Sequence, residues 1–341
     1  MNHAKGHTIY AILVCALLIP ASLACTVCGP MVNGPLTSST EANSVEPEAF
    51  AVDLGSVYGL AFDEEGYLFA VGSKGDTSVL WRIDPNGEKE LFAEILDRGD
   101  KLSDAGLAAH ASFLASVAID GERNVWITSR RQGACFVVTP DKDALKIYLN
   151  GYMSVTLQDT LEYSQGVAWD ADSEQLHIIT SGPESAYGTV FREHIRALTL
   201  DEINNITVNE SKTMNNTGVE IQEKGNGLVQ GRDALYLIGR QALYEVKADG
   251  ELKKAGVNAR GMTLWGGVAD GEGAMYLAAN DADYTPEEGL GKSGLILKMD
   301  SEGKQTVLLE GIGQPLGMAF RGGYLYVADR ATGSILRIEI R

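Results

Sequence analysis

Residues 317–329 read GMAFRGGYLYVAD near the end of the chain, and residues 59–72 near its other end read GLAFDEEGYLFAVG. Each stretch begins with Gly and a short apolar run, passes through a polar turn that contains Gly, and continues into a second apolar run rich in Tyr, Leu and Val. This pattern predicts a β-hairpin, with its turn at residues 64–66 in one stretch and at residues 321–323 in the other.

The same hairpin pattern occurs six times along the chain. The four middle copies are SVAIDGERNVWITS from Ser116, GVAWDADSEQLHIITS from Gly166, GLVQGRDALYLIG from Gly227 and GGVADGEGAMYLAA from Gly266. We take six residues as equivalent in these copies: Ala61, Ala118, Ala168, Val229, Ala269 and Ala319. Their spacing averages about 52 residues, and a repeat near this length is typical of propellers and related repeat architectures.

A third and usually a fourth apolar run follow each hairpin, and turns at residues 84–87, 248–250 and 300–303 end in Gly. Four antiparallel strands repeated six times predict an all-β fold, the six-bladed β-propeller, because each small sheet can bury both faces only against its neighbours. The sixth copy is one strand short, and we expect residues 48–54 to supply that strand and close the ring. The inner strands carry Gly and Ala, as expected where six strands converge on a narrow channel.

The first 24 residues have the features of a signal peptide. Lys5 precedes an apolar run at residues 9–19, Pro20 ends the run, and small residues follow. The run is too short for a stable membrane span. We therefore expect export from the cytoplasm with cleavage before Cys25, a flexible tether at residues 25–46, and one propeller domain at residues 47–341. The mature protein would be secreted, periplasmic or anchored at the cell surface.

Three cysteines remain after such cleavage, namely Cys25, Cys28 and Cys135. An odd number suits a lipidated Cys25, as in a bacterial lipoprotein, and it also suits a local pair of Cys25 with Cys28 that leaves Cys135 as a small buried hydrophobe. A zinc or redox role for the CTVC stretch is disfavoured, because no second pair of ligands occurs in the sequence.

The formal net charge of the chain is −18. A surface this acidic repels nucleic acid and anionic membranes, so neither is expected as a partner, apart from a membrane held through a lipid on Cys25. A small anionic ligand or another protein is the expected partner.

The stretches GLAFD and YVADRATGSILRIE resemble the NHL-repeat propellers and the senescence-marker-protein and gluconolactonase-like propellers, over about residues 47–341. This resemblance implies a divalent cation, usually calcium, at the mouth of the channel, held by a Glu before the first blade and by Asn or Asp just before the inner strands. Asn226 matches that pattern as Asn-Gly, and Gln165 is a weaker match. Asn280 and Asp281 offer further oxygen donors, or they form a solvated turn. Residues 55–58 contain no carboxylate, which counts against the metal site and against lactonase activity.

Arginines form a second candidate site. Five of them fall in loops expected at the channel mouth: Arg130, Arg131, Arg240, Arg260 and Arg330. Guanidinium groups converging from several blades would bind a carboxylate, phosphate or sulfate, whereas the alternative is that each pairs with a neighbouring acidic residue such as Asp329.

Few side chains suit acid–base catalysis. His110 lies in a long segment before the second blade and is the one candidate base, whereas His177 is expected to pack between blades. Three acceptor sequons, at Asn205, Asn209 and Asn215, would be glycosylated if the source modifies exported proteins, or they are chance matches in a turn.

Two functions follow. One is a non-catalytic exported propeller that binds an anionic small molecule or a partner protein at its mouth. The other is a calcium-dependent lactonase or esterase of the gluconolactonase-like type. The absence of a Glu before the first blade favours the binding function, and the Asn-Gly at Asn226 supports the enzyme as the alternative.

Overall fold

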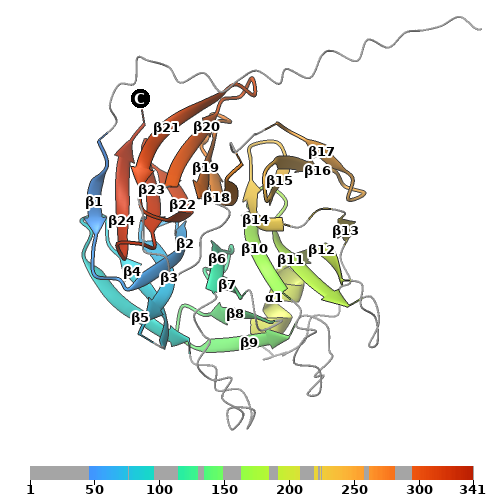
Figure 1. The fold of residues 1–341 in the computed structure, drawn as a ribbon. Helices are drawn as coiled ribbons and strands as arrows, with labels where there is room; N and C mark the ends of the chain where they lie inside the picture. The colour runs from blue at the N-terminus through green and yellow to red at the C-terminus, as the bar shows by residue number, and fades with distance from the viewer. Residues whose placement is uncertain are drawn as a thin grey trace, which may run out of the picture. The chain divides into compact units, whose positions relative to one another are not determined.

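The computed structural model of the chain describes residues 46–75, 77–95, 114–129, 134–148, 163–183, 191–207, 219–221, 223, 225–256, 261–280 and 294–340. Within these residues the fold is six four-stranded antiparallel sheets arranged as the blades of a ring (Figure 1). The predicted six-bladed β-propeller is confirmed. The predicted signal peptide, the tether and both N-terminal cysteines lie outside the described residues.

The blades follow one another in sequence, and within each the strands run from the channel outward. Blade 1 comprises β2 (Ser56–Phe62), β3 (Leu68–Lys74), β4 (Thr77–Ile83) and β5 (Lys89–Ile95). Blade 2 comprises β6 (Leu114–Ile119), β7 (Val125–Ser129), β8 (Ala134–Val138) and β9 (Ala144–Tyr148). Blade 3 comprises β10 (Tyr163–Asp170), β11 (Gln175–Pro183), β12 (Phe191–Thr199) and β13 (Val219–Ile221).

The second half of the ring has the same plan. Blade 4 comprises β14 (Gly225–Gln230), β15 (Leu235–Gly239), β16 (Leu243–Val246) and β17 (Leu252–Lys254). Blade 5 comprises β18 (Thr263–Ala269), β19 (Met275–Asn280), β20 (Gly294–Met299) and β21 (Gln305–Ile312). Blade 6 comprises β22 (Pro315–Arg321), β23 (Tyr324–Asp329), β24 (Ser334–Glu339) and, from the start of the chain, β1 (Glu48–Ala51).

The ring closes as the sequence predicts, through the pairing of β1 with β24. Arg337 of β24 forms an ion pair with Glu48 of β1. Its guanidinium also lies over the rings of Phe50 and Tyr324, at 5.3 and 5.2 Å from their centroids. The first strand of the domain therefore completes the last blade, which explains why the two ends of the chain carry matching hairpins.

The predicted turns are confirmed, because Gly66, Gly87, Gly250 and Gly303 all have positive φ angles. One predicted equivalence is wrong by one residue. Ala61 pairs with Phe69, which is the second pair counted from the hairpin turn. Ala269 pairs with Met275, which is the first pair counted from the turn of its hairpin. Val268, paired with Tyr276, is the true counterpart of Ala61. The pairing register decides which residues are equivalent between blades, and a shared small side chain does not.

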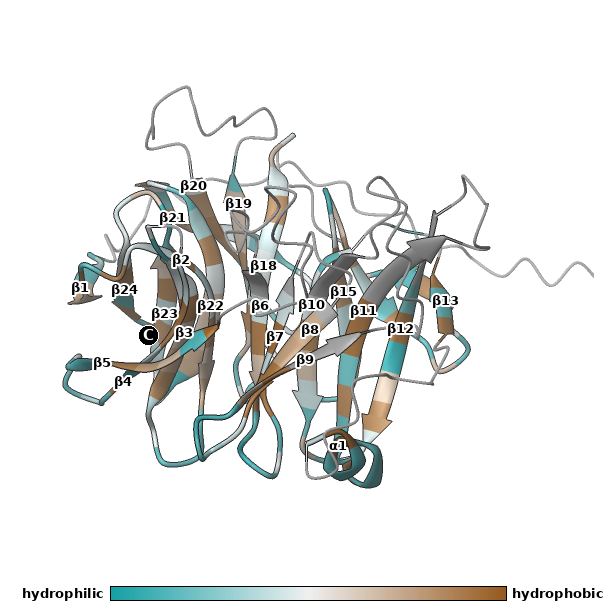
Figure 2. Cartoon of the chain, turned by 90° about the horizontal axis from the view of Figure 1, so that it is seen from below, coloured by the Kyte–Doolittle hydropathy of each residue, from teal (hydrophilic) through white to brown (hydrophobic). Residues whose placement is uncertain are grey.

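The core lies between the blades, where apolar side chains of adjacent sheets meet. Figure 2 shows hydrophobic positions, in brown, along the strands of these sheets. Between blades 6 and 1, for example, Leu60 and Val79 pack with Tyr326 and Ile335. Each fully buried side chain of this size contributes about 1.5–3 kcal/mol. Because every such cluster joins two blades, no blade is expected to be stable alone.

A short helix, α1 (Leu200–Thr207), follows β12 and was not predicted from the sequence. Its residues Ile203 and Ile206 are buried in the cluster between blades 2 and 3. The Thr199 backbone N–H donates to the Glu202 carboxylate at 2.9 Å, and the Glu202 N–H donates to Thr199 Oγ1 at 3.4 Å. This is a capping box, so the stretch TLDE carried a signal for the helix. No helix among the described residues has the length and apolar character needed to cross a bilayer.

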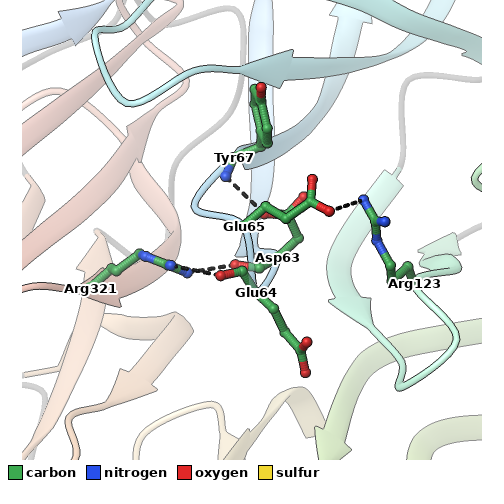
Figure 3. A network of polar contacts seen from close by, with 6 residues as sticks. All are labelled: Asp63, Glu64, Glu65, Tyr67, Arg123 and Arg321. Atoms are coloured by element: carbon green, nitrogen blue, oxygen red, sulfur yellow. Dashed lines mark hydrogen bonds and ion pairs between the residues drawn. The ribbon is translucent and has the colours of Figure 1, made fainter.

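The first hairpin turn of blade 1 is held between the turns of both neighbouring blades (Figure 3). Arg321 of blade 6 donates from Nη1 and Nη2 to the carbonyl oxygens of Asp63 and Glu64, at 2.5 and 2.9 Å. On the other side, Arg123 of blade 2 pairs with Glu65 at 3.0 Å. The ion pair is half exposed and contributes little, about 0–1 kcal/mol. These contacts lie at the hairpin end of the inner strands and leave the opposite end for the site.

Candidate functional site

All six inner strands have a β-bulge at the same place, close to their first residues. In blade 1, for example, the register shifts between Val57 and Gly59, so that Tyr58 is the extra residue. Counted from the hairpins, the bulge positions are occupied by Tyr58, Ala115, Gln165, Asn226, Trp265 and Leu316. A bulge redirects the side chain it carries, and bulges are common beside binding sites.

The residue after the bulge is Gly in five of the six blades. In four of these, all but Gly227, a Cβ would press against the backbone of the neighbouring inner strand. A Cβ on Gly317 would lie 2.5 Å from the Tyr58 carbonyl oxygen, and one on Gly166 would lie 2.6 Å from the Leu228 nitrogen. A Cβ on Gly266 would overlap the Leu316 carbonyl oxygen. The Gly that opens the hairpin pattern is therefore required by the narrow radius of the ring.

The channel contains a cavity of about 430 Å³, lined by all six inner strands. Four of the bulge residues line it, namely Tyr58, Asn226, Trp265 and Leu316. Gln314 and Arg330 add two more polar side chains, and Arg330 is the one charged side chain among the described lining residues. A cavity of this volume is large enough for a small organic molecule.

Arg330 is held at the cavity by neutral groups. Its Nη1 donates to Gln314 Oε1 at 3.3 Å, and its guanidinium lies 5.4 Å from the ring centroid of Tyr58. No ion pair among the described residues includes Arg330. The predicted alternative, pairing with Asp329, does not occur, because that carboxylate accepts hydrogen bonds from the Gln314 and Ala331 backbone N–H groups at 2.7 and 3.1 Å.

The structure brings only part of the predicted arginine site together. Arg240 follows Gly239 of blade 4 as Arg330 follows Asp329 of blade 6, and these two preceding residues pair at equivalent positions before the bulge. Arg240 is nevertheless exposed and does not line the cavity. Arg130, Arg131 and Arg260 lie outside the described residues.

Two of the predicted metal ligands are held through their amide nitrogens, and Asn280 Oδ1 is buried without a hydrogen-bond partner among the described residues. Asn226 Nδ2 donates to the Leu264 carbonyl oxygen at 2.7 Å, and Asn280 Nδ2 donates to the Pro315 carbonyl oxygen at 2.6 Å. Both asparagines are buried, and each ties its blade to the start of the next inner strand. Gln165 lies in β10 at the bulge position, but its side chain is outside the described residues, as are Asp281 and the candidate base His110.

The members of this donor set whose side chains are described, Asn226 and Asn280, supply amide oxygens only, and Asp281, its one carboxylate, lies outside the described residues. Calcium sites in proteins are built with carboxylate oxygens, and none of the six bulge positions carries Asp or Glu. The described residues contain no group of three or more His, Cys, Asp or Glu that could hold a metal ion. Blade 1 presents Tyr58 at its bulge, and the Arg330 cation lies over the ring of that residue.

No protein-family model matches the chain, and no curated protein sequence does either. Among solved structures, a gluconolactonase from Xanthomonas campestris is similar at 13% identity, with 90% of this chain and 94% of that chain covered and a TM-score of 0.59. The chain has the propeller fold of gluconolactonase-like proteins. A luciferin-regenerating enzyme shares this fold at 15% identity, covering 86% and 95% of the two chains with a TM-score of 0.52. At these identities the likeness establishes the fold alone.

Four residues that line the cavity were not predicted from the sequence to do so, namely Tyr58, Trp265, Leu316 and Gln314. A signal for the first three was present, since each directly precedes the Gly that opens a hairpin copy. Asn226 and Gln165 were selected at this same position only because their amides suit a metal ion.

Proposed function

We propose that this protein binds a small molecule with an anionic group in the channel cavity, and that Arg330 contacts that group. The observation that supports the proposal is the placement of Arg330 as the one charged side chain among the described residues lining the cavity. A guanidinium without a carboxylate partner is a favourable partner for an anion, and its hydrogen bonds to the anion are charge-assisted. The expected signal peptide would place this binding outside the cytoplasm.

A lactonase or esterase is the second candidate, and the comparisons favour it over a purely binding role, since solved propellers of this fold include gluconolactonases. In lactone hydrolysis, water adds to the carbonyl carbon, the ring C–O bond breaks, and a hydroxy acid forms. That product is a small carboxylate, so both candidates give Arg330 the same kind of partner. Asn226, Gln165 and His110 are the proposed polar contacts of the reaction. The described donors do not fit calcium, and no step is assigned to it.

Two measurements test these proposals. Thermal melting with a library of small anions should show stabilisation, because a ligand of the native state raises its unfolding free energy. The Leu316→Trp variant should abolish that stabilisation by filling the cavity, since Trp265 shows that the bulge position accommodates Trp. Hydrolysis of lactones and aryl esters, with Asn226→Ala as the comparison, tests the enzyme. Stabilisation without turnover supports the binding role, and turnover lost in Asn226→Ala supports the enzyme.

A further inference from the structure

We infer that the cavity selects a singly charged carboxylate over a phosphate ester and over a neutral molecule of the same shape. This inference rests on the proposed function and narrows it to one class of anion. It depends on how Arg330 is held, on the charge of the other lining residues, and on the two blades that build the anion site.

The guanidinium is positioned with part of its donor edge free. Gln314 Oε1 accepts from Nη1, and the Gln314 carbonyl oxygen accepts from the Arg330 backbone N–H at 3.0 Å. The guanidinium carbon lies over the ring of Tyr58. These contacts leave Nε and Nη2 without a partner among the described residues. Two parallel N–H groups on one planar edge match the two oxygens of a carboxylate.

Gln314 is the residue that keeps this arrangement in place. Its side chain is 5% exposed, and its backbone N–H is bound by the buried carboxylate of Asp329. Thr332 Oγ1 donates to the other oxygen of that carboxylate at 3.0 Å. The Asp329 carboxylate therefore stabilises the turn that carries Arg330 and forms no ion pair with the guanidinium.

The described lining residues favour a ligand with one negative charge. Arg330 is the single charged group among the described lining residues, and the whole chain carries −18. A phosphate monoester carries about −1.5 to −2 near neutral pH, so one guanidinium leaves part of its charge unpaired in a cavity whose other described lining residues are uncharged. A monocarboxylate is neutralised by the same single contact.

The site also spans the seam where the ring closes. Arg330 and Gln314 belong to blade 6, Tyr58 belongs to blade 1, and β1 joins blade 6 from the other end of the chain. Leu316 and Trp265 line the cavity on the same side, from blades 6 and 5. The apolar body of a ligand whose carboxylate binds here would contact Tyr58, Trp265 and Leu316.

The test uses two sets of matched probes with the mature protein: benzoate, benzamide and phenyl phosphate, and gluconate, glucose and glucose 6-phosphate. Affinities are measured by calorimetry. We expect at least one carboxylate to bind at millimolar concentration or below, about tenfold or more tighter than its neutral and phosphate counterparts. Arg330→Gln should weaken the binding of that carboxylate by about tenfold to a hundredfold, the usual range for a lost charge-assisted hydrogen bond.

Arg240→Gln is the matched control, because Arg240 occupies the corresponding position of blade 4 but lies outside the cavity. It should leave every affinity unchanged. Arg330→Lys keeps the charge without the planar edge and should lose most of the preference for the carboxylate. If Arg330→Gln fails to fold, Arg330→Lys and the wild-type probe series still decide the question.

Each outcome bears on the inference. A phosphate that binds as tightly as its carboxylate overturns the selectivity and leaves the anion-binding proposal standing. A second result would overturn both proposals. In it, the neutral probe binds as tightly as the carboxylate, Arg330→Gln leaves the affinities unchanged, and Leu316→Trp abolishes binding. The cavity would then bind a neutral ligand. Failure of both carboxylates to bind also overturns the inference.

Discussion

Replacing Gly317 by Ala tests whether the Gly of the hairpin pattern is required by contact between blades. The new Cβ would lie 2.5 Å from the Tyr58 carbonyl oxygen and 2.6 Å from the Gly59 Cα atom, whereas ordinary van der Waals contact begins at 3.4 Å. Both neighbouring atoms belong to the backbone of β2, so no side chain can rotate to relieve the overlap. The inner strand of blade 1 would have to move by nearly an ångström.

Such overpacking costs about 1–3 kcal/mol, and a rigid backbone neighbour places Gly317→Ala at the upper end of that range. In a domain of this size the melting temperature should fall by about 3–5 °C. Denaturant unfolding and calorimetry of the mature protein measure both quantities. The variant should still be a propeller by circular dichroism, since only one of the interfaces between blades is altered.

Gly271→Ala is the matched control, because a Cβ at this turn position meets nothing within 4 Å and the φ angle is not in the left-handed region. That variant should be neutral or stabilised by about 0.4–1 kcal/mol, through the reduced entropy of the unfolded chain. If Gly317→Ala melts within a degree or two of the wild type, the ring is not limited by contact between inner strands, and the explanation given for the repeated Gly is wrong.

Two further predictions concern buried titratable groups. Burial lowers the pKa of His177 from its ordinary 6.5, with Asp170 acting in the opposite direction, so the unfolded chain takes up the proton first as the pH falls. The stability present above about pH 6.5 should therefore decline as the pH falls below that value. Urea unfolding should show a shallower decline in His177→Gln, and equal slopes would contradict this. Burial also raises the pKa of the Cys135 thiol to about 12. In a chain carrying Cys25→Ser and Cys28→Ser, a maleimide should label this thiol after unfolding and leave it unlabelled in the native state near pH 8; labelling of the native protein at the rate of a free thiol would show that Cys135 is accessible.

The fold was predictable because its information is local and repeated. The hairpin turns were placed from Gly at 66, 87, 250 and 303, and the shortfall of one strand after residue 339 pointed to β1 as the closing strand. The misplacement of Ala269 shows the limit of this reasoning, since similarity of side chains does not determine a pairing register. Helix α1 escaped notice although Thr199 and Glu202 carry its capping signal.

The site was predictable only in part, for a different reason. The sequence placed five arginines and several amides on one face, but it could not say which of them reach the channel. Arg240 and Arg330 have matching positions in their blades, yet only Arg330 lines the cavity. Asn226 and Asn280 both donate from Nδ2 to backbone carbonyls of the next blade, a structural role that the sequence pattern did not predict.

The amino-acid sequence by itself determined the number of blades, the strand alternation and the closure of the ring, because each depends on spacing and turn chemistry within about fifty residues of chain. The tertiary structure decided the chemistry of the mouth. Tyr58 and Arg330 are separated by most of the chain and meet only when blade 6 packs against blade 1. Whether a guanidinium faces a carboxylate or an open cavity depends on that packing, and no local pattern in the sequence specifies it.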